Sequence, residues 1–272
     1  MEATLKTLWM KFSVLGCGWL GLPLAEFLVK KEFVVKGSTT SEEKLLLLKS
    51  KRIHPYLIEI NNQRSNDAIE DFLQTDVLFV NVPFGKQREN RQAYVDLIAK
   101  IEQSSVQKVI FVSSTSVYAD TNSTITKTAG FEINPAKQGL LDLENLFRGN
   151  KHFDCTVIRF SGLIGGSRNP GNFFKEGRIV KNGLAPVNLI HLKDCIRIVY
   201  TILEKKAWNQ VFNASADSHP TRKEFYTAAT LLANKTPATF LEELDRFKII
   251  SNEPLKKALG YTFHYPDLMQ LL

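Results

Sequence analysis

The sequence predicts an α/β fold of the Rossmann type, a doubly wound parallel sheet with a small C-terminal α/β lobe. Short apolar runs alternate with amphipathic stretches over the first two thirds of the chain, as in a parallel sheet that helices cover on both faces. The first apolar run, Lys11–Leu15, leads directly into three glycines spaced G-x-G-x-x-G. This glycine pattern between a strand and a helix is typical of dinucleotide-binding sheets.

The elements of the sheet are expected in alternating order. Strands are predicted over 11–15, 32–37, 53–60, 76–83, 108–113 and 156–160, and helices over 20–31, 40–51, 66–74, 89–104 and 137–148. The fourth and fifth strands are apolar at nearly every position, as strands buried on both faces are. Thr40 followed by Glu43 has the pattern of a capping box, so Thr40 is expected to cap the second helix.

The later part of the chain is less regular. A polar loop is expected over 119–134, and a Gly-, Asn- and Pro-rich excursion over the sheet edge at 161–184. Further elements are predicted as a helix over 193–205, a strand over 211–214, two short helical stretches from 219 on, a strand over 248–250 and a last helix over 254–259. The predicted domains are a dinucleotide-binding domain over 1–218 and a small substrate lobe over 219–272.

Composition excludes several classes of protein. The chain has 272 residues and a net charge of +7, but its basic residues are spread out and no zinc-finger or RNA-binding pattern occurs, so nucleic acid is not an expected partner. No apolar stretch approaches the ~20 residues of a membrane helix, and no signal peptide is evident. The cysteines Cys17, Cys155 and Cys195 are far apart and lack metal-ligand spacing, which predicts no metal site and reduced thiols in the cytoplasm.

Each glycine of the loop has a distinct expected role. Gly16 permits the tight turn, Gly18 lets a pyrophosphate approach the backbone, and Gly21 lets the helix pack closely on the strand. The N-terminus of the following helix supplies N–H groups and a partial positive charge for phosphates. The alternative is a glycine turn that serves packing alone.

The end of the second strand predicts which dinucleotide binds. Sites for NAD usually place Asp or Glu on the ribose about 20 residues beyond the first glycine. Here Ser38, Thr39, Thr40 and Ser41 stand in that region, followed by Lys44. Because position 38 is a serine, no carboxylate stands there to repel a 2′-phosphate. The hydroxyls and Lys44 can bind such a phosphate, which favours NADP over NAD. The alternative is that the hydroxyls only cap the next helix.

The remaining cofactor residues are expected at the carboxyl ends of neighbouring strands. Phe84, Gly85 and the loop beyond should border the cofactor. The complete set predicted to bind the dinucleotide is Gly16, Gly18, Trp19, Leu20, Gly21, Ser38, Thr39, Thr40, Lys44, Asn81, Pro83 and Ser113.

Four motifs in order, GCGWLGLPLA, FVSSTSVYAD, VIRFSGLIGGSR and VNLIHLKDCIR, resemble a known family. The family is the extended branch of the short-chain dehydrogenases/reductases, the NAD-dependent epimerase/dehydratase type, and the resemblance runs from Lys11 to the closing LGYTFHYP. It implies a catalytic Ser at the end of the fifth strand, which falls on Ser114. It also implies a Tyr-x-x-x-Lys pair on the next helix, in which the Tyr moves a proton while hydride moves to or from the nicotinamide.

That pair is absent from this sequence. When Pro135 and Glu144 are matched to the family, Ala136 takes the place of the Tyr and Leu140 that of the Lys. Neither side chain can move a proton, because a phenol works as an acid or base only with a cation nearby. Ordinary carbonyl reduction is therefore not expected.

Three other residues are candidates for the missing chemistry. Tyr118 is a nearby phenol, although it is usually structural in the family. His191, in IHLKD, can act as an acid or base, or else anchors the end of its strand. Arg168, in GGSRNPG, lies where the family's substrate loop often offers a cation, or else is a solvated loop residue. Arg159 is expected to brace its strand.

These observations lead to competing functional hypotheses. The first is an NAD(P)-dependent epimerase- or reductase-like enzyme acting on a small carbonyl or nucleotide-sugar-like substrate, with Ser114, Tyr118 and His191 as catalytic candidates and Arg168 contacting substrate. The second is a dinucleotide-sensing or regulatory subunit without catalysis, and a weaker third is a scaffold without cofactor. A homodimer is expected by analogy with the family alone.

Overall fold

A computed structural model describes residues 10–60, 68–83, 90–126 and 128–272. The chain forms two compact units that interleave along the sequence. Unit 1 comprises Met1–Ser113, Gly139–Val157 and Lys206–Gln210, and unit 2 comprises Ser114–Gln138, Ile158–Lys205 and Val211–Leu272. The predicted division into a dinucleotide-binding domain over 1–218 and a substrate lobe over 219–272 stays a prediction.

The central sheet has seven strands in the order β11-β7-β5-β4-β1-β2-β3. Their bounds are β1 Lys11–Leu15, β2 Val34–Thr39, β3 His54–Leu57, β4 Val77–Val80, β5 Lys108–Ser114, β7 Asp154–Phe160 and β11 Val211–Ala214. Within unit 1 every recorded pairing is parallel, with Phe12 of β1 opposite Val35 on one side and Val77 on the other. The strand order reverses at β1, as in a doubly wound sheet, so the predicted fold class is confirmed.

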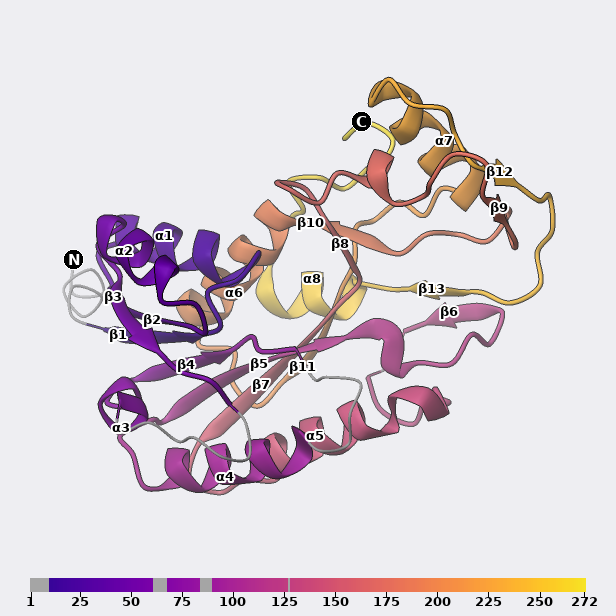
Figure 1. The fold of residues 1–272 in the computed structure, drawn as a ribbon. Coiled ribbons are helices and arrows are strands. Elements are labelled where there is room, and N and C mark those ends of the chain that lie inside the picture. Colours follow the sequence, from indigo (N-terminus) through magenta and orange to yellow (C-terminus); the bar gives the residue numbers. More distant parts are fainter. Residues whose placement is uncertain (1–9, 61–67, 84–89, 127) are drawn as a thin grey trace. The chain divides into compact units, whose positions relative to one another are not determined.

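Helices cover both faces of the unit 1 sheet. Figure 1 shows α1 (Gly21–Lys30) and α2 (Glu43–Ser50) on one face, and α4 (Asn90–Glu102) and α5 (Gln138–Arg148) on the other. A short helix, α3 (Ala68–Phe72), precedes β4. Burial on both faces explains the apolar sequences of the inner strands, whose side chains are almost fully buried.

The predicted capping of the second helix is wrong. Helix α2 begins at Glu43 with Glu42 at its N-cap, and no side chain caps it. Instead the Thr39 hydroxyl accepts a hydrogen bond from the Ser41 N–H at 3.2 Å and shapes the turn before the helix. Thr40 lies two residues before the N-cap, outside the position from which a hydroxyl reaches the orphan N–H groups.

The described residues of unit 2 form three small two-stranded parallel sheets. These pair β8 (Gly162–Ile164) with β10 (Leu189–His191), β9 (Ile179–Val180) with β12 (Thr239–Phe240), and β6 (Ser123–Ile125) with β13 (Lys248–Ile250). The predicted polar loop over 119–134 thus contains a strand, and the excursion over 161–184 contains two. These strands are only two or three residues long, which explains why no periodicity reveals them.

Three α-helices complete the part of unit 2 that the structure describes. They are α6 (Leu192–Lys205), α7 (Arg222–Leu232) and α8 (Glu253–Leu259). Helix α7 has the capping box that α2 lacks, since Thr221 and Glu224 exchange hydrogen bonds at its N-terminus. Within the described ranges, no helix is both long and apolar enough to cross a membrane.

Candidate functional site

The glycine loop between β1 and α1 has the geometry that its three glycines require. Gly16 has φ +99°, a conformation that side chains rarely adopt, and a Cβ on it would lie 2.9 Å from the Asn81 carbonyl oxygen. A Cβ on Gly21 would lie 2.2 Å from the Gly16 carbonyl oxygen, so only glycine lets α1 approach β1 this closely. A Cβ on Gly18 would meet nothing within 4 Å. The loop is therefore tight at its two ends and open in the middle.

The first glycine is held by side chains on both sides of its peptide. Its N–H donates to the Ser38 hydroxyl at 2.9 Å, and its carbonyl accepts from the Asn81 side-chain amide at 3.1 Å. The next residue extends the same arrangement, because the Cys17 N–H donates to the Ser38 carbonyl at 2.8 Å. The ends of β2 and β4 thus fix the loop that follows β1.

The start of α1 is arranged as an anion site would be. The helix begins at Gly21 with Leu20 at the N-cap, and Leu20 offers no side-chain hydrogen bond. No acidic residue occupies the first turn. The Leu22 N–H already donates to the Gly18 carbonyl at 3.1 Å and Pro23 has no N–H, so what the first turn offers a ligand beside Gly18 is chiefly the partial positive charge of the helix N-terminus. Trp19 completes the turn and is partly exposed.

A glycine that sequence analysis did not single out supports this loop. A Cβ on Gly37 of β2 would lie 2.7 Å from the Cys17 Sγ. Burial raises the pKa of the Cys17 thiol to about 12, so the thiol stays neutral and acts as a packing group. A glycine one residue before Ser38 was the available signal, because a small residue inside a strand often marks a close approach.

The hydroxyl-rich end of β2 divides into buried and exposed positions. Ser38 is 2% exposed and faces the glycine loop, and Thr39 is also buried. Thr40 and Lys44 are exposed. Of these residues, Ser38 therefore supports the loop through a hydrogen bond, and Thr40 and Lys44 lie on the surface.

The predicted residues at the ends of β4 and β5 differ in their roles. Asn81 contacts the glycine loop, and Pro83 is exposed just beyond it. Ser113 instead donates its hydroxyl to the Glu144 carboxylate at 2.5 Å, and both residues are buried. This bond ties β5 to α5 inside unit 1. Phe84 and Gly85 lie outside the described residues.

Ser114 begins unit 2 and caps a short turn. Its hydroxyl oxygen accepts the Ser116 N–H at 3.1 Å and so starts the 3₁₀ turn Thr115–Val117. Its own hydroxyl proton can still be donated to another group. Ala136 lies in a second such turn, Pro135–Lys137, which the Asn134 side chain caps. Ala136 is exposed.

Tyr118 belongs to a buried polar network in unit 2. Its hydroxyl donates to the Asn213 side-chain oxygen at 2.5 Å and accepts from the Arg159 guanidinium at 2.8 Å. Arg159 also donates to the Thr128 carbonyl and lies over the rings of Tyr118 and Phe131. This geometry favours a structural role for Tyr118 over the catalytic one, and it fits the expectation that Arg159 braces its strand.

His191 lies against the turn that carries Arg168. A Cβ on Gly165 would lie 2.3 Å from the His191 Nε2, so the imidazole packs directly on this glycine, whose φ is +98°. Gly165 and Arg168 exchange two backbone hydrogen bonds of 3.0 Å, which close the turn. Two of the predicted residues of unit 2 are thus brought into one neighbourhood, although Arg168 itself is exposed.

The environment of His191 keeps its ring neutral. Its Nδ1 accepts the Lys193 N–H at 3.2 Å, which puts the ring proton on Nε2. Burial lowers the pKa of His191, with the nearby Asp194 opposing this effect and Lys193 and His264 adding to it. Asp194 is buried and accepts hydrogen bonds from the Tyr261 hydroxyl and from the N–H groups of His264 and Tyr265. At neutral pH the ring is therefore uncharged and carries its proton on Nε2, the atom that lies against Gly165.

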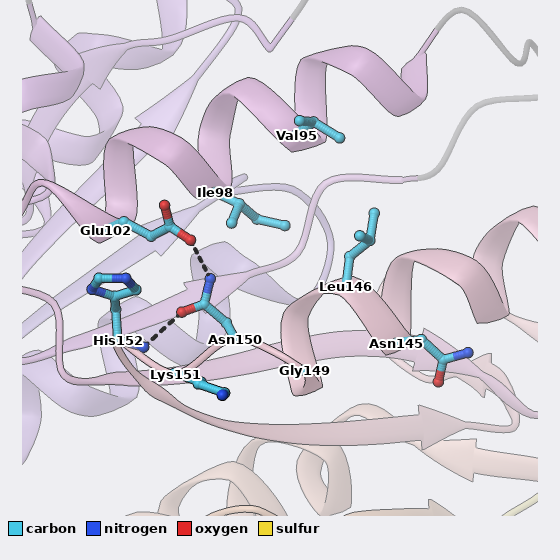
Figure 2. Close-up of a pocket in the computed structure, with 9 residues that line it drawn as sticks. All are labelled: Val95, Ile98, Glu102, Asn145, Leu146, Gly149, Asn150, Lys151 and His152. Carbon is cyan, nitrogen blue, oxygen red and sulfur yellow. Dashed lines mark hydrogen bonds between the residues drawn. The ribbon is translucent and has the colours of Figure 1, made fainter.

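A surface hollow of about 470 Å³ lies elsewhere in unit 1 (Figure 2). It is lined by Val95, Ile98, Glu102, Asn145, Leu146, Gly149, Asn150, Lys151 and His152. These residues lie on α4, at the end of α5 and in the segment 149–152 between α5 and β7, so the hollow lies toward the amino ends of β5 and β7. The glycine loop follows the carboxyl end of β1, at the opposite edge of a parallel sheet. None of the predicted site residues lines this hollow.

Solved structures share this fold over nearly the whole chain. UDP-glucuronic acid 4-epimerase from Bacillus cereus in complex with NAD matches with TM-score 0.75 and 18% identity, covering 93% of this chain and 91% of that one. A short-chain dehydrogenase/reductase superfamily protein from Agrobacterium tumefaciens with bound NAD matches with TM-score 0.77 and 13% identity, covering 96% and 94%. The chain therefore has the fold of the short-chain dehydrogenases/reductases, and the predicted resemblance is confirmed at this level.

At the level of sequence, the chain is similar to protein YeeZ of Escherichia coli strain K12. The two are 29% identical over 268 residues, which cover 94% of this chain and 97% of YeeZ. That name states no activity. No family model matches the chain.

Proposed function

We propose that the chain binds NADP, or less favourably NAD, at the glycine loop and belongs to the extended short-chain dehydrogenases/reductases. The loop geometry is the observation that carries the proposal: Gly16 and Gly21 are tight where backbone must meet backbone, and Gly18 is open where a pyrophosphate would approach. The relatives of the same fold named above were solved with NAD.

The preference for NADP is supported by the hydrogen bonding of Ser38. Its oxygen accepts the Gly16 N–H, so the proton of its hydroxyl is what it can offer a ligand. A donor suits the oxygens of a 2′-phosphate, whereas the carboxylate of an NAD site accepts from ribose hydroxyls. Lys44, exposed on the first turn of α2, adds a positive charge at the same end of β2.

The proposed reaction is hydride transfer coupled to proton transfer on a small carbonyl or nucleotide-sugar-like substrate. A bound nicotinamide would supply or take up the hydride. The chain's own groups would act on the substrate oxygen: Ser114 can donate its hydroxyl proton in a hydrogen bond, and the neutral His191 can donate from Nε2. A neutral imidazole that donates in this way polarises a carbonyl without protonating it fully. Arg168 would contact an anionic group of the substrate.

One observation favours a second candidate function. Ala136 and Leu140 stand where the family has its Tyr and Lys, so the chain lacks the usual acid/base pair. A dinucleotide-sensing protein would keep the glycine loop and tolerate this loss. We place either protein in the cytoplasm, supported by three buried free cysteines among the described residues. Pairing into a homodimer stays part of the proposal and rests on analogy.

Titration with dinucleotides tests the proposal. NADPH is expected to raise the unfolding temperature, and NADH is expected to do so only at higher concentration. No shift with either dinucleotide would contradict both candidate functions. Turnover of NADPH with any of a panel of sugars, aldehydes and ketones would support the enzyme, and its loss in Ser114→Ala and His191→Gln would support the residue assignment. Binding of NADPH without turnover across the panel would favour the sensor.

A further inference from the structure

The glycine loop depends on a residue of α4 that no sequence motif contains. Asn81, directly after β4, holds the Gly16 carbonyl with its side chain, and its own N–H donates to the Leu15 carbonyl at 2.9 Å. The Gly16 backbone is so close to Asn81 that a Cβ on Gly16 would touch the Asn81 carbonyl. Any movement of the chain at Asn81 would therefore move the first glycine of the loop.

The backbone at Val82, the residue after Asn81, is fixed by a side chain from the hydrophobic core. The Tyr94 hydroxyl donates to the Val82 carbonyl at 2.8 Å. Strand β4 ends at Val80, so this carbonyl lies beyond the recorded ladder between β4 and β5 and receives a hydrogen bond from a side chain instead. Tyr94 is fully buried, and its ring packs edge-on against Phe111 and Phe147. The core thereby sets the direction in which the chain leaves β4.

We propose that Tyr94 is a positioning residue for the dinucleotide site. Through Val82 it fixes Asn81, and through Asn81 it holds Gly16 in the turn that phosphate binding requires. The inference rests on the proposed dinucleotide binding and adds to it the residue that keeps the loop in its binding conformation before any ligand arrives.

The hydroxyl, and not the ring, carries this role. Phenylalanine would fill the same space between Phe111 and Phe147, so core packing alone gives no reason for a tyrosine at position 94. Burial raises the pKa of the Tyr94 phenol, which keeps the hydroxyl protonated and able to donate. A buried phenol whose recorded bond goes to a strand-end carbonyl beside the loop is suited to fix backbone.

The test compares Tyr94→Phe with Asn81→Ala, the double variant, and Tyr56→Phe as a matched control. Tyr56 lies on β3 in the same unit, opposite Ser38 of β2, and its hydroxyl donates to the Asp71 side chain rather than to the backbone of the loop. NADPH affinity is measured by calorimetric titration, and hydrogen exchange of residues 14–21 is measured without ligand.

Tyr94→Phe is expected to weaken NADPH binding about fivefold, which is the usual effect of one lost hydrogen bond. It should also speed exchange in the loop, while Tyr56→Phe changes neither. The double variant should bind about as weakly as Asn81→Ala alone, because the two residues act in series. Unchanged affinity and exchange in Tyr94→Phe, or additive losses in the double variant, would overturn the inference.

The exchange measurement separates this inference from the proposed function. If the wild-type chain binds no dinucleotide but Tyr94→Phe still loosens residues 14–21, the proposed function fails and the coupling of Tyr94 to the loop stands. If NADPH binds and Tyr94→Phe leaves the loop and its affinity unchanged, the proposed function stands and the inference fails.

Discussion

The glycine loop of unit 1 and the polar groups of unit 2 are built differently: backbone geometry determines the first, and individual side chains make up the second. In the loop, only glycine fits at positions 16 and 21, because a Cβ on either would lie under 3 Å from a backbone carbonyl oxygen, and Ser38 and Asn81 hold the N–H and the carbonyl of Gly16. In unit 2 the hydroxyl of Tyr118 is engaged by two buried partners. The conformation of the loop is set by backbone contacts that few side-chain substitutions disturb, whereas acid/base chemistry rests on single side chains that one substitution removes.

The largest effect is expected at the tight end of the loop. Gly21→Ala places a Cβ 2.2 Å from the Gly16 carbonyl oxygen, so α1 must move away from β1. The free energy of unfolding should fall by at least about 3 kcal/mol, measured by urea unfolding. A Gly21→Ala protein as stable as the wild type would show that the close approach of α1 to β1 does not determine the loop. The loop and the polar groups of unit 2 would then not differ in this way.

The second prediction concerns the network of unit 2. Tyr118→Phe leaves Asn213 and Arg159 without the hydroxyl between them, inside a buried region. We expect a loss of about 2 kcal/mol in the free energy of unfolding. Lost turnover at unchanged stability would instead identify Tyr118 as catalytic, and the polar groups of unit 2 would then serve chemistry after all.

The third prediction follows from two histidines of unit 2. Burial lowers the pKa of His191 and of His219 below the usual 6.5, with Asp194 opposing this for the first and the Val187 carbonyl and Asp217 for the second. Below that pH the unfolded chain binds protons that the folded chain does not, so stability falls as pH falls through this range and is constant above it.

Urea unfolding at about pH 7.5 and about pH 5.5 measures this dependence. His219→Asn and His191→Asn should each flatten it, since each removes one group that titrates differently in the two states. Stability that rises on acidification would show that the two histidines are charged in the folded protein, contrary to the lowered pKa that their partial burial gives them.

The smallest effect is expected at the rim of the loop. Lys44→Ala should weaken NADPH binding about threefold and leave NADH unchanged, because an exposed charge acts weakly on a 2′-phosphate. Lys49→Ala is the matched control, since it removes an exposed lysine from the last turn of the same helix. Equal losses for both dinucleotides would remove Lys44 from the basis of the NADP preference.

The sequence allowed prediction of the sheet and of the glycine loop because both depend on local patterns. The roles of Gly16 and Gly21 follow from spacing between one strand and the next helix, and the structure has the contacts these roles require. The predicted cap at Thr40 is wrong. The capping-box spacing fits both Thr39 with Glu42 and Thr40 with Glu43, and in the structure the Thr39 hydroxyl shapes the turn before the helix.

Contacts between distant residues were beyond such patterns. The bond from Asn81 to Gly16 spans 65 positions, and strand β6 exists only because it pairs with β13, more than a hundred residues later. The Tyr94 hydroxyl gave no signal at all, since a tyrosine on a buried helix face reads like any other core aromatic residue.

The central claim, that a dinucleotide sits over Gly18, is tested most directly by calorimetric titration of NADPH into the wild-type chain and into Gly18→Ala. Gly18 does not have a positive φ, and a Cβ there meets nothing within 4 Å, so the variant should fold with unchanged stability. We predict that the wild-type chain binds NADPH and that Gly18→Ala binds it at least about tenfold more weakly, because the methyl group occupies the space of the pyrophosphate. Equal binding by the two proteins would contradict the claim.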